Sequence, residues 1–251
     1  MVQTEKLQAT ERMRMDISCA LDILYEAKGL VPSRYFQECY GVLILSIAEF
    51  GVLVSGTSGR GILMSHSPRN NVWSSPLSVN LHGIGLGLSI GLEQKDVIIF
   101  IHSPAMIAKF ATNVHLQLGS HAAHTWGRSS GEERHPYMLH ATSDGGFLEG
   151  QATTTFAFAH GHFYGIELEG AVLKSNRKRH RAFYGSAITP KRILLGNSPV
   201  RCNQRSGVQD LQSKLARLAA PESQQRQQAE QEHEIPAASW IRQGLAATSA
   251  V

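Results

Sequence analysis

The sequence predicts an α+β domain with a largely antiparallel β-sheet core, N-terminal helices and a C-terminal tail that is partly helical and partly disordered. Two observations favour this class. Short apolar or alternating segments, separated by glycine-rich turns, fill most of residues 41–195 and are typical of strands. Apolar residues at helical spacing gather near the start of the chain.

The first 29 residues predict one amphipathic helix. Its apolar face recurs at spacings of three and four, and Gly29 is a suitable stop. Its basic residues, Lys6, Arg12, Arg14 and Lys28, are nearly cancelled by neighbouring acids. The helix is therefore interpreted either as docked on the domain or as facing a membrane through its apolar side.

Further elements follow from local patterns. A short helix is expected over 33–39, because Pro32 suits the first turn, and another helix is expected over 103–112. The glycine-rich segment 55–61 predicts a turn that joins two strands into a hairpin. The expected strands are 41–45, 50–54, 62–64, 97–101, 153–159 and 166–169.

A further strand is expected over 83–91, where glycines alternate with large apolar residues. Gly83, Gly85 and Gly87 fall on one face of such a strand. Glycine weakens a strand, so a row of three indicates a close approach by something on that face. The approaching group is interpreted as a neighbouring part of a tightly packed sheet or as a ligand.

Residues 201–251 differ in composition from the rest. One short amphipathic helix is expected after residue 207 and ends before Pro221. Residues 222–234 are rich in Gln and Glu and predict disorder. The apolar residues that follow, Ile235, Trp240, Ile241 and Leu245, are interpreted as a docking peptide or as part of an inert tail.

Composition restricts the class and the location of the protein. The chain has 251 residues, of which 42% are hydrophobic, and a formal net charge of +4. Three scattered cysteines argue for a reducing compartment, and the start of the chain has no apolar signal segment. A soluble protein in the cytoplasm is expected.

The strongest charge feature is a basic run before Phe183, interpreted as a loop. It consists of Lys174, Arg177, Lys178, Arg179 and Arg181. Each such residue near an anionic membrane contributes about 1 kcal/mol. The run could also contact the acidic surface of a protein or remain a solvated loop, and nucleic acid is not expected because no recognition motif accompanies it.

Enzymatic and metal-binding motifs are missing from the sequence. There is no Gly-x-Ser-x-Gly elbow, no complete dinucleotide fingerprint and no phosphate-loop lysine. The histidine pairs 121/124 and 160/162 lack a third and fourth ligand. No enzyme activity, no cofactor and no metal are expected.

Several blocks in order resemble the SYLF domain, also called the Ysc84 actin-binding domain. They are Trp73-Ser74-Ser75-Pro76 with the glycine strand, Phe156 to Gly170, and Phe183-Tyr184-Gly185, preceded by Val31-Pro32 and the Gly59-Arg60-Gly61 turn. The resemblance covers residues 30–200, so the domains are predicted as 1–29, 30–200 and 201–251. Tyr40 and His160 stand where that family has lysine, and His82 replaces a glycine.

The resemblance implies a non-enzymatic domain that binds phosphoinositides and other anionic phospholipids and is linked to actin filaments and endocytosis. A peripheral protein of the plasma or endosomal membrane is therefore expected, with the basic run and the first helix as its lipid-binding residues. The alternative is a cytoskeletal protein that binds actin filaments without a primary lipid role. The oligomeric state is left open.

Overall fold

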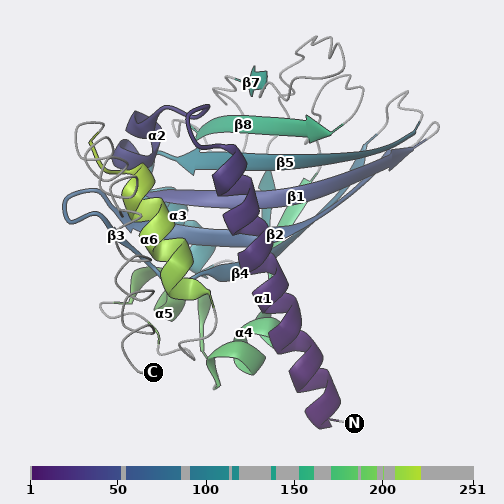
Figure 1. Cartoon of the computed structure of the whole chain (residues 1–251). Helices are drawn as coiled ribbons and strands as arrows, with labels where there is room; N and C mark the ends of the chain where they lie inside the picture. The colour runs from purple at the N-terminus through teal and green to yellow at the C-terminus, as the bar shows by residue number, and fades with distance from the viewer. Residues whose placement is uncertain are drawn as a thin grey trace, which may run out of the picture.

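The computed structural model describes residues 2–51, 55–85, 91–112, 115–118, 137–139, 153–160, 171–185, 188–196, 200 and 207–221. Within these residues, nine strands form one antiparallel sheet with helices around it (Figure 1). The strands are β1 (Gly41–Gly51), β2 (Ser55–Ser67), β3 (Val72–Trp73), β4 (Leu77–Gly85), β5 (Gly91–Ile101), β6 (His115–Leu118), β7 (Tyr137–Leu139), β8 (Thr153–His160) and β9 (Ala171–Ser175). The helices are α1 (Val2–Glu26), α2 (Ser33–Glu38), α3 (Pro104–Thr112), α4 (Arg177–Tyr184), α5 (Pro190–Leu195) and α6 (Val208–Leu218).

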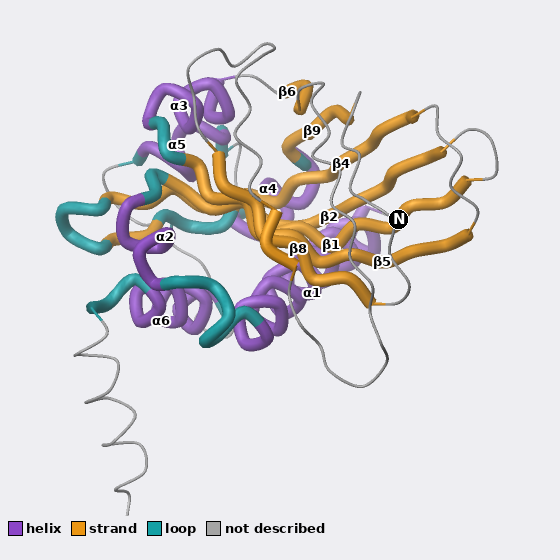
Figure 2. The backbone as a smooth tube through the Cα atoms, turned by 90° about the horizontal axis from the view of Figure 1, so that it is seen from above, coloured by secondary structure: helices purple, strands orange, loops and turns teal. Residues whose placement is uncertain are grey.

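The sheet has the strand order β6-β9-β4-β2-β1-β5-β8-β7, and β3 pairs with β2 beside this path. Every pair is antiparallel, so the predicted α+β class with an antiparallel core is confirmed. β1 lies at the centre, where Val42 to Leu45 are all buried. A continuous apolar run is stable in a strand only when both faces of the sheet are covered. Figure 2 shows the cover: α1 and α6 lie on one face, and α3 and α5 lie on the other.

The predicted turn over 55–61 is wrong, because those residues belong to β2. β1 continues without a break to Gly51, and β2 begins at Ser55. Gly61 pairs with Leu45, and a Cβ atom at Gly61 would lie 1.9 Å from the carbonyl oxygen of Ile44. Glycine is required there for the close approach of two backbones. The predicted strand 62–64 is confirmed as part of β2.

The predicted single strand over 83–91 is also wrong. β4 ends at Gly85 and β5 begins at Gly91, and β2 and β1 lie between them in the sheet. Gly83 pairs with Thr57 of β2. Gly87 lies outside the described residues, so its expected face is untested. The motif belongs to two strands that pair with different neighbours.

The predicted helices are confirmed. In α1, Met13, Ile17, Ala20 and Leu24 are buried at helical spacing, so this part of the helix is docked on the domain. Gly29 has a φ of +83°, a left-handed conformation that suits the chain reversal after α1. The predicted strands 97–101 and 153–159 are confirmed within β5 and β8, whereas 166–169 and 222–251 lie outside the described residues.

None of the helices described above combines the length and the apolar character needed to cross a lipid bilayer.

Candidate functional site

The basic run is not the loop that the sequence predicted: Lys174 lies on strand β9, and Arg177, Lys178, Arg179 and Arg181 lie on helix α4. Asn176 caps its first turn, because its side chain accepts a hydrogen bond from the backbone N–H of Arg179. Gly185 ends it with a φ of +85°, and the Gly185 N–H donates to the carbonyl of Arg181. Two good caps therefore stabilise a short helix whose own sequence is crowded with like charges.

The inward side of α4 fixes the helix to the domain. Arg179 is buried, and its Nη1 donates to Asp16 Oδ2 at 2.6 Å and to Ser78 Oγ at 3.0 Å. Ser78 Oγ in turn donates to Asp16 Oδ2 at 2.9 Å. Burial raises the pKa of Asp16, and the charge of Arg179 opposes that shift. This ion pair joins α1, α4 and β4.

Two further side chains hold the same side of the helix. His180 is fully buried, and its Nε2 lies 3.1 Å from the carbonyl oxygen of Ser78. Burial lowers the pKa of His180 to about 4, so the ring is neutral at pH 7 and its Nε2–H donates to that carbonyl. The Tyr184 hydroxyl donates to the carbonyl of Pro76 at 2.6 Å. None of these inward groups is available to a ligand.

The outward side of α4 carries the free cations. Arg177, Lys178 and Arg181 are exposed, and Lys174 is exposed on the preceding strand β9. A hollow of about 630 Å³ lies beside them. We call it the basic hollow; it is lined by Asn80, His82, Lys174, Ser175, Asn176, Arg177 and Lys178. Among the residues that the structure describes, no carboxylate lines this space, so their charge is positive.

A smaller hollow links the basic hollow to α1. It has a volume of about 210 Å³ and is lined by both helices, with Arg12 from α1 and Lys178 and Asn176 from α4. Figure 1 shows α4 beside the N-terminal half of α1. Glu5 is the one acidic residue in its lining. The structure thus brings Arg12 to the same surface as the basic helix.

The other predicted basic residues are placed differently. Lys6 is exposed on α1, and Arg14 forms an ion pair with Glu11 at 3.2 Å. Lys28 lies two residues beyond the opposite end of α1, whose last residue, Glu26, is about 21 Å along the helix axis from Arg12 at a rise of 1.5 Å per residue. The predicted residues that gather on one surface are therefore Arg12, Lys174, Arg177, Lys178 and Arg181.

The sequence did not single out Asn80, His82 and Asn176 as members of this surface. Lys174 of β9 pairs in register with Asn80 of β4, and His82 follows Asn80 two residues later on β4. No local pattern in the sequence gives that pairing. The cap role of Asn176 could have been predicted, because it directly precedes Arg177 and Gly185 follows Arg177 after eight residues, as at the two ends of a short helix.

Several amide, imidazole and cationic donors converge on one hollow, an arrangement suited to phosphate oxygens. Among the residues that the structure describes, no group of three or more His, Cys, Asp or Glu could hold a metal ion. His121, His124 and His162 lie outside those residues, so the expectation about the two histidine pairs is untested.

The fold and this surface define the class of the protein: a domain with one antiparallel sheet that gathers its exposed cations beside a short, well-capped helix. The chain belongs to the Ysc84 family, whose model, described as "Las17-binding protein actin regulator", matches residues 82–218. The predicted SYLF resemblance is thereby confirmed.

Curated relatives agree with the family match. The chain is 30% identical over 172 residues to the SH3 domain-containing protein PJ696.02 of Schizosaccharomyces pombe, covering 68% of this chain and 38% of the relative. It is 28% identical over 170 residues to the SH3 domain-containing YSC84-like protein 1 of Homo sapiens, covering 68% of this chain and 47% of the relative. The chain thus spans less than half the length of these relatives. No solved structure matches the chain.

Proposed function

We propose that this chain is a non-enzymatic module that binds anionic phospholipids, phosphoinositides above all, on cytoplasmic membranes and links them to actin. The basic hollow is the observation that carries this proposal. Three of its lining residues, Lys174, Arg177 and Lys178, are exposed cations, and none of its described lining residues is a carboxylate. A phosphorylated headgroup supplies the negative charge that this space lacks.

The number of cations suits reversible binding. Arg12, Lys174, Arg177, Lys178 and Arg181 would together contribute about 5 kcal/mol at an anionic surface of low ionic strength. A dissociation constant of about 1 mM corresponds to about 4 kcal/mol. Electrostatics alone therefore supports weak, salt-sensitive recruitment, typical of a peripheral protein of the plasma or endosomal membrane.

The link to actin is supported by the family. Its model is described as an actin regulator that binds Las17. The same exposed cations could contact the acidic surface of a filament, which gives the second candidate function: an actin-binding cytoskeletal protein without a primary lipid role.

Vesicle flotation tests the lipid proposal. Phosphatidylcholine vesicles with and without phosphoinositide are mixed with the full chain and with the double variant Arg177→Glu/Lys178→Glu. The matched control is Arg69→Glu/Lys191→Glu, which makes the same charge change at exposed positions on the β2–β3 connection and on α5. We expect the first variant to float at least about 30-fold less and the control to float like the natural chain. Equal flotation of both variants would refute the site.

Co-pelleting with actin filaments in the absence of lipid distinguishes the two functions. Filament binding together with loss of vesicle binding at all phosphoinositide levels would favour the cytoskeletal alternative. Vesicle binding that weakens with added salt supports the primary proposal.

A further inference from the structure

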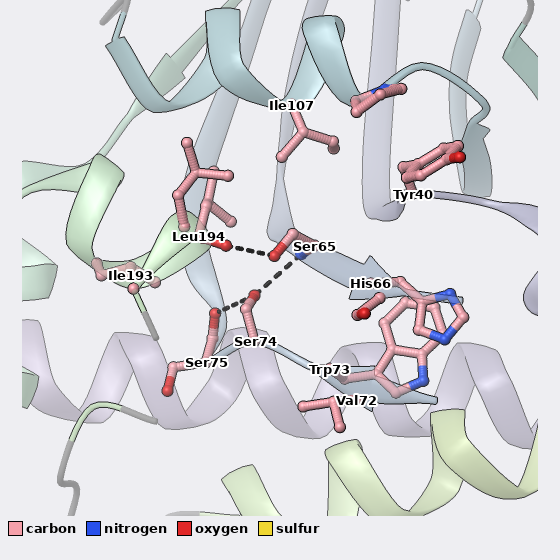
Figure 3. A pocket seen from close by; sticks show the side chains of 14 residues that line it. Tyr40, Ser65, His66, Val72, Trp73, Ser74, Ser75, Ile107, Ile193 and Leu194 are labelled. Atoms are coloured by element: carbon pink, nitrogen blue, oxygen red, sulfur yellow. Dashed lines mark hydrogen bonds between the residues drawn. The ribbon is translucent and has the colours of Figure 1, made fainter. Parts of the chain in front are cut away.

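A third hollow lies where β2 and β3 meet α3 and α5 (Figure 3). Its volume is about 280 Å³. Ligand pockets usually measure about 300–1,000 Å³, so this one suits one or two large side chains and is too small for a cofactor. We call it the tryptophan pocket, because Trp73 forms one wall, stacked on His66 with ring centroids 4.1 Å apart.

Several polar groups of the tryptophan pocket are paired, whereas Trp73 Nε1 is buried without a hydrogen-bond partner among the described residues. The Ser65 hydroxyl donates to the carbonyl of Leu194 at 2.5 Å, and the Ser65 N–H donates to the Ser74 hydroxyl at 2.9 Å. His66 Nδ1 lies 2.8 Å from the carbonyl oxygen of Cys39. Ile107, Ile193 and Leu194 give the pocket an apolar wall, as Figure 3 shows. An apolar side chain can enter without displacing a hydrogen bond.

The rim of the tryptophan pocket exposes large apolar side chains. Tyr40, Val72 and Leu195 keep 39%, 54% and 43% of their surface exposed. Among the described residues, seven large hydrophobic side chains are exposed, and these three surround one hollow. Single exposed apolar residues are ordinary, whereas a cluster at a pocket marks a docking surface.

The charge around the pocket is positive. Arg192 borders it, since its Nη1 lies 2.9 Å from the position of a Cβ on Gly196, which lines the pocket. Lys191 is exposed on the same helix, and Arg69 is exposed on the connection that precedes Val72. The surface therefore fits an apolar segment that follows acidic residues.

This chain contains such a segment. Glu230, Glu232 and Glu234 precede Ile235, and Trp240 and Ile241 follow within seven residues. We propose that residues 235–245 dock into the tryptophan pocket of the same chain, with Trp240 as the anchor and the glutamates beside the basic rim. The contact is intramolecular.

The geometry of α6 permits this contact. Gln212 Nε2 donates to the carbonyls of Trp73 and Ser74 at 3.0 and 3.1 Å, and Asn71 Nδ2 donates to the carbonyl of Ala216 at 3.0 Å. The middle of α6 therefore lies beside the pocket, and the chain leaves the helix beside α2, where Gln37 Nε2 donates to the carbonyl of Ala220 at 3.3 Å. Residues 222–234 can span at most about 45 Å, whereas a domain of this size has a radius of gyration of about 16 Å. Tethering over this distance also gives an effective concentration of about 1 mM.

Photo-crosslinking in the full chain tests the proposal. Val72→benzoylphenylalanine places the reactive group at the rim, and Leu30→benzoylphenylalanine is the control, because Leu30 is exposed to 43% and does not line the pocket. After irradiation at low concentration, we expect peptides from residues 235–245 to be crosslinked to position 72 within the monomer. Crosslinks at the control level, or only in a covalent dimer, would overturn the proposal.

A second pair of substitutions tests the anchor. Trp240→Ala in the position-72 chain should lower the crosslink yield by about tenfold, the loss typical of an aromatic anchor. Gln243→Ala is the control and should leave the yield unchanged. Equal yields from both substitutions would contradict the role of Trp240. Position 240 lies outside the described domain, so folding of the sheet does not confound the result.

Discussion

The two sides of helix α4 carry similar residues and perform opposite tasks. On the inward side, Arg179 is buried against Asp16 and Ser78 and joins α1 to the sheet. On the outward side, Arg177, Lys178 and Arg181 are exposed. Only the outward cations are free to attract an anionic partner.

The difference teaches that a basic run is not a uniform patch. A helix turns by about 100° per residue, so neighbouring arginines point to different surroundings. Arg179 forms an ion pair with the buried carboxylate of Asp16, whereas the guanidinium of Arg177, two residues earlier, is exposed at the surface. The following experiments separate these roles.

The largest expected effect is on the inward side. Arg179→Met leaves Asp16 buried, with Arg60 Nε still 3.9 Å from Oδ1. Removing one partner of a buried ion pair costs about 3–5 kcal/mol, so the free energy of unfolding in urea should fall by that amount. Arg177→Met on the same helix should change it by less than about 0.5 kcal/mol. Equal losses would contradict the division between the two sides.

The next effect is a pH dependence. Because burial lowers the pKa of His180 from 6.5 to about 4, the unfolded chain binds this proton more readily than the folded chain. The contribution of neutral His180 to the free energy of unfolding is therefore fully present above pH 6.5. It is lost progressively as the pH falls to 4, which lowers the free energy of unfolding by about 3 kcal/mol. Urea unfolding of the natural chain and of His180→Gln over this range measures the difference. A constant difference between the two chains would contradict the assignment.

A smaller effect is expected at Asn176, which caps α4 and also lines the basic hollow. Asn176→Ala should lower the free energy of unfolding by about 1 kcal/mol, the usual value of a lost cap. Asn176→Asp keeps a cap acceptor and should retain the stability, but its charge should weaken binding to phosphoinositide vesicles. Stability and flotation measured on both variants separate the two roles. A lower free energy of unfolding in Asn176→Asp would contradict the capping role of this side chain.

The sequence predicted the parts of the fold that local pattern controls. The spacing of Met13, Ile17 and Leu24 predicted the docked face of α1, and the apolar run 97–101 predicted the buried part of β5. The sequence pattern wrongly assigned the glycines of residues 55–61 to a turn. Gly61 is typical of a turn by composition, but its role is set by Ile44 on a neighbouring strand, a contact that local pattern does not reveal.

The sequence predicted the cations of the candidate site but not their directions, because local pattern does not reveal contacts between distant residues. The run 174–181 identified the cations, and the capping residues Asn176 and Gly185 were available to identify the helix. The inward direction of Arg179 depends on Asp16, which is 163 residues away in the sequence. The spacing of residues in the sequence does not predict an ion pair between such distant residues. The helix caps are local and could have predicted a helix at this position.

The most direct test measures stability and vesicle binding on one variant, Arg177→Gln/Lys178→Gln. We expect its free energy of unfolding to stay within about 0.5 kcal/mol of the natural chain. Its binding to phosphoinositide vesicles should fall about 30-fold, because two surface cations contribute about 2 kcal/mol. Unchanged vesicle binding by this stable variant would contradict the assignment of lipid binding to the outward side of α4.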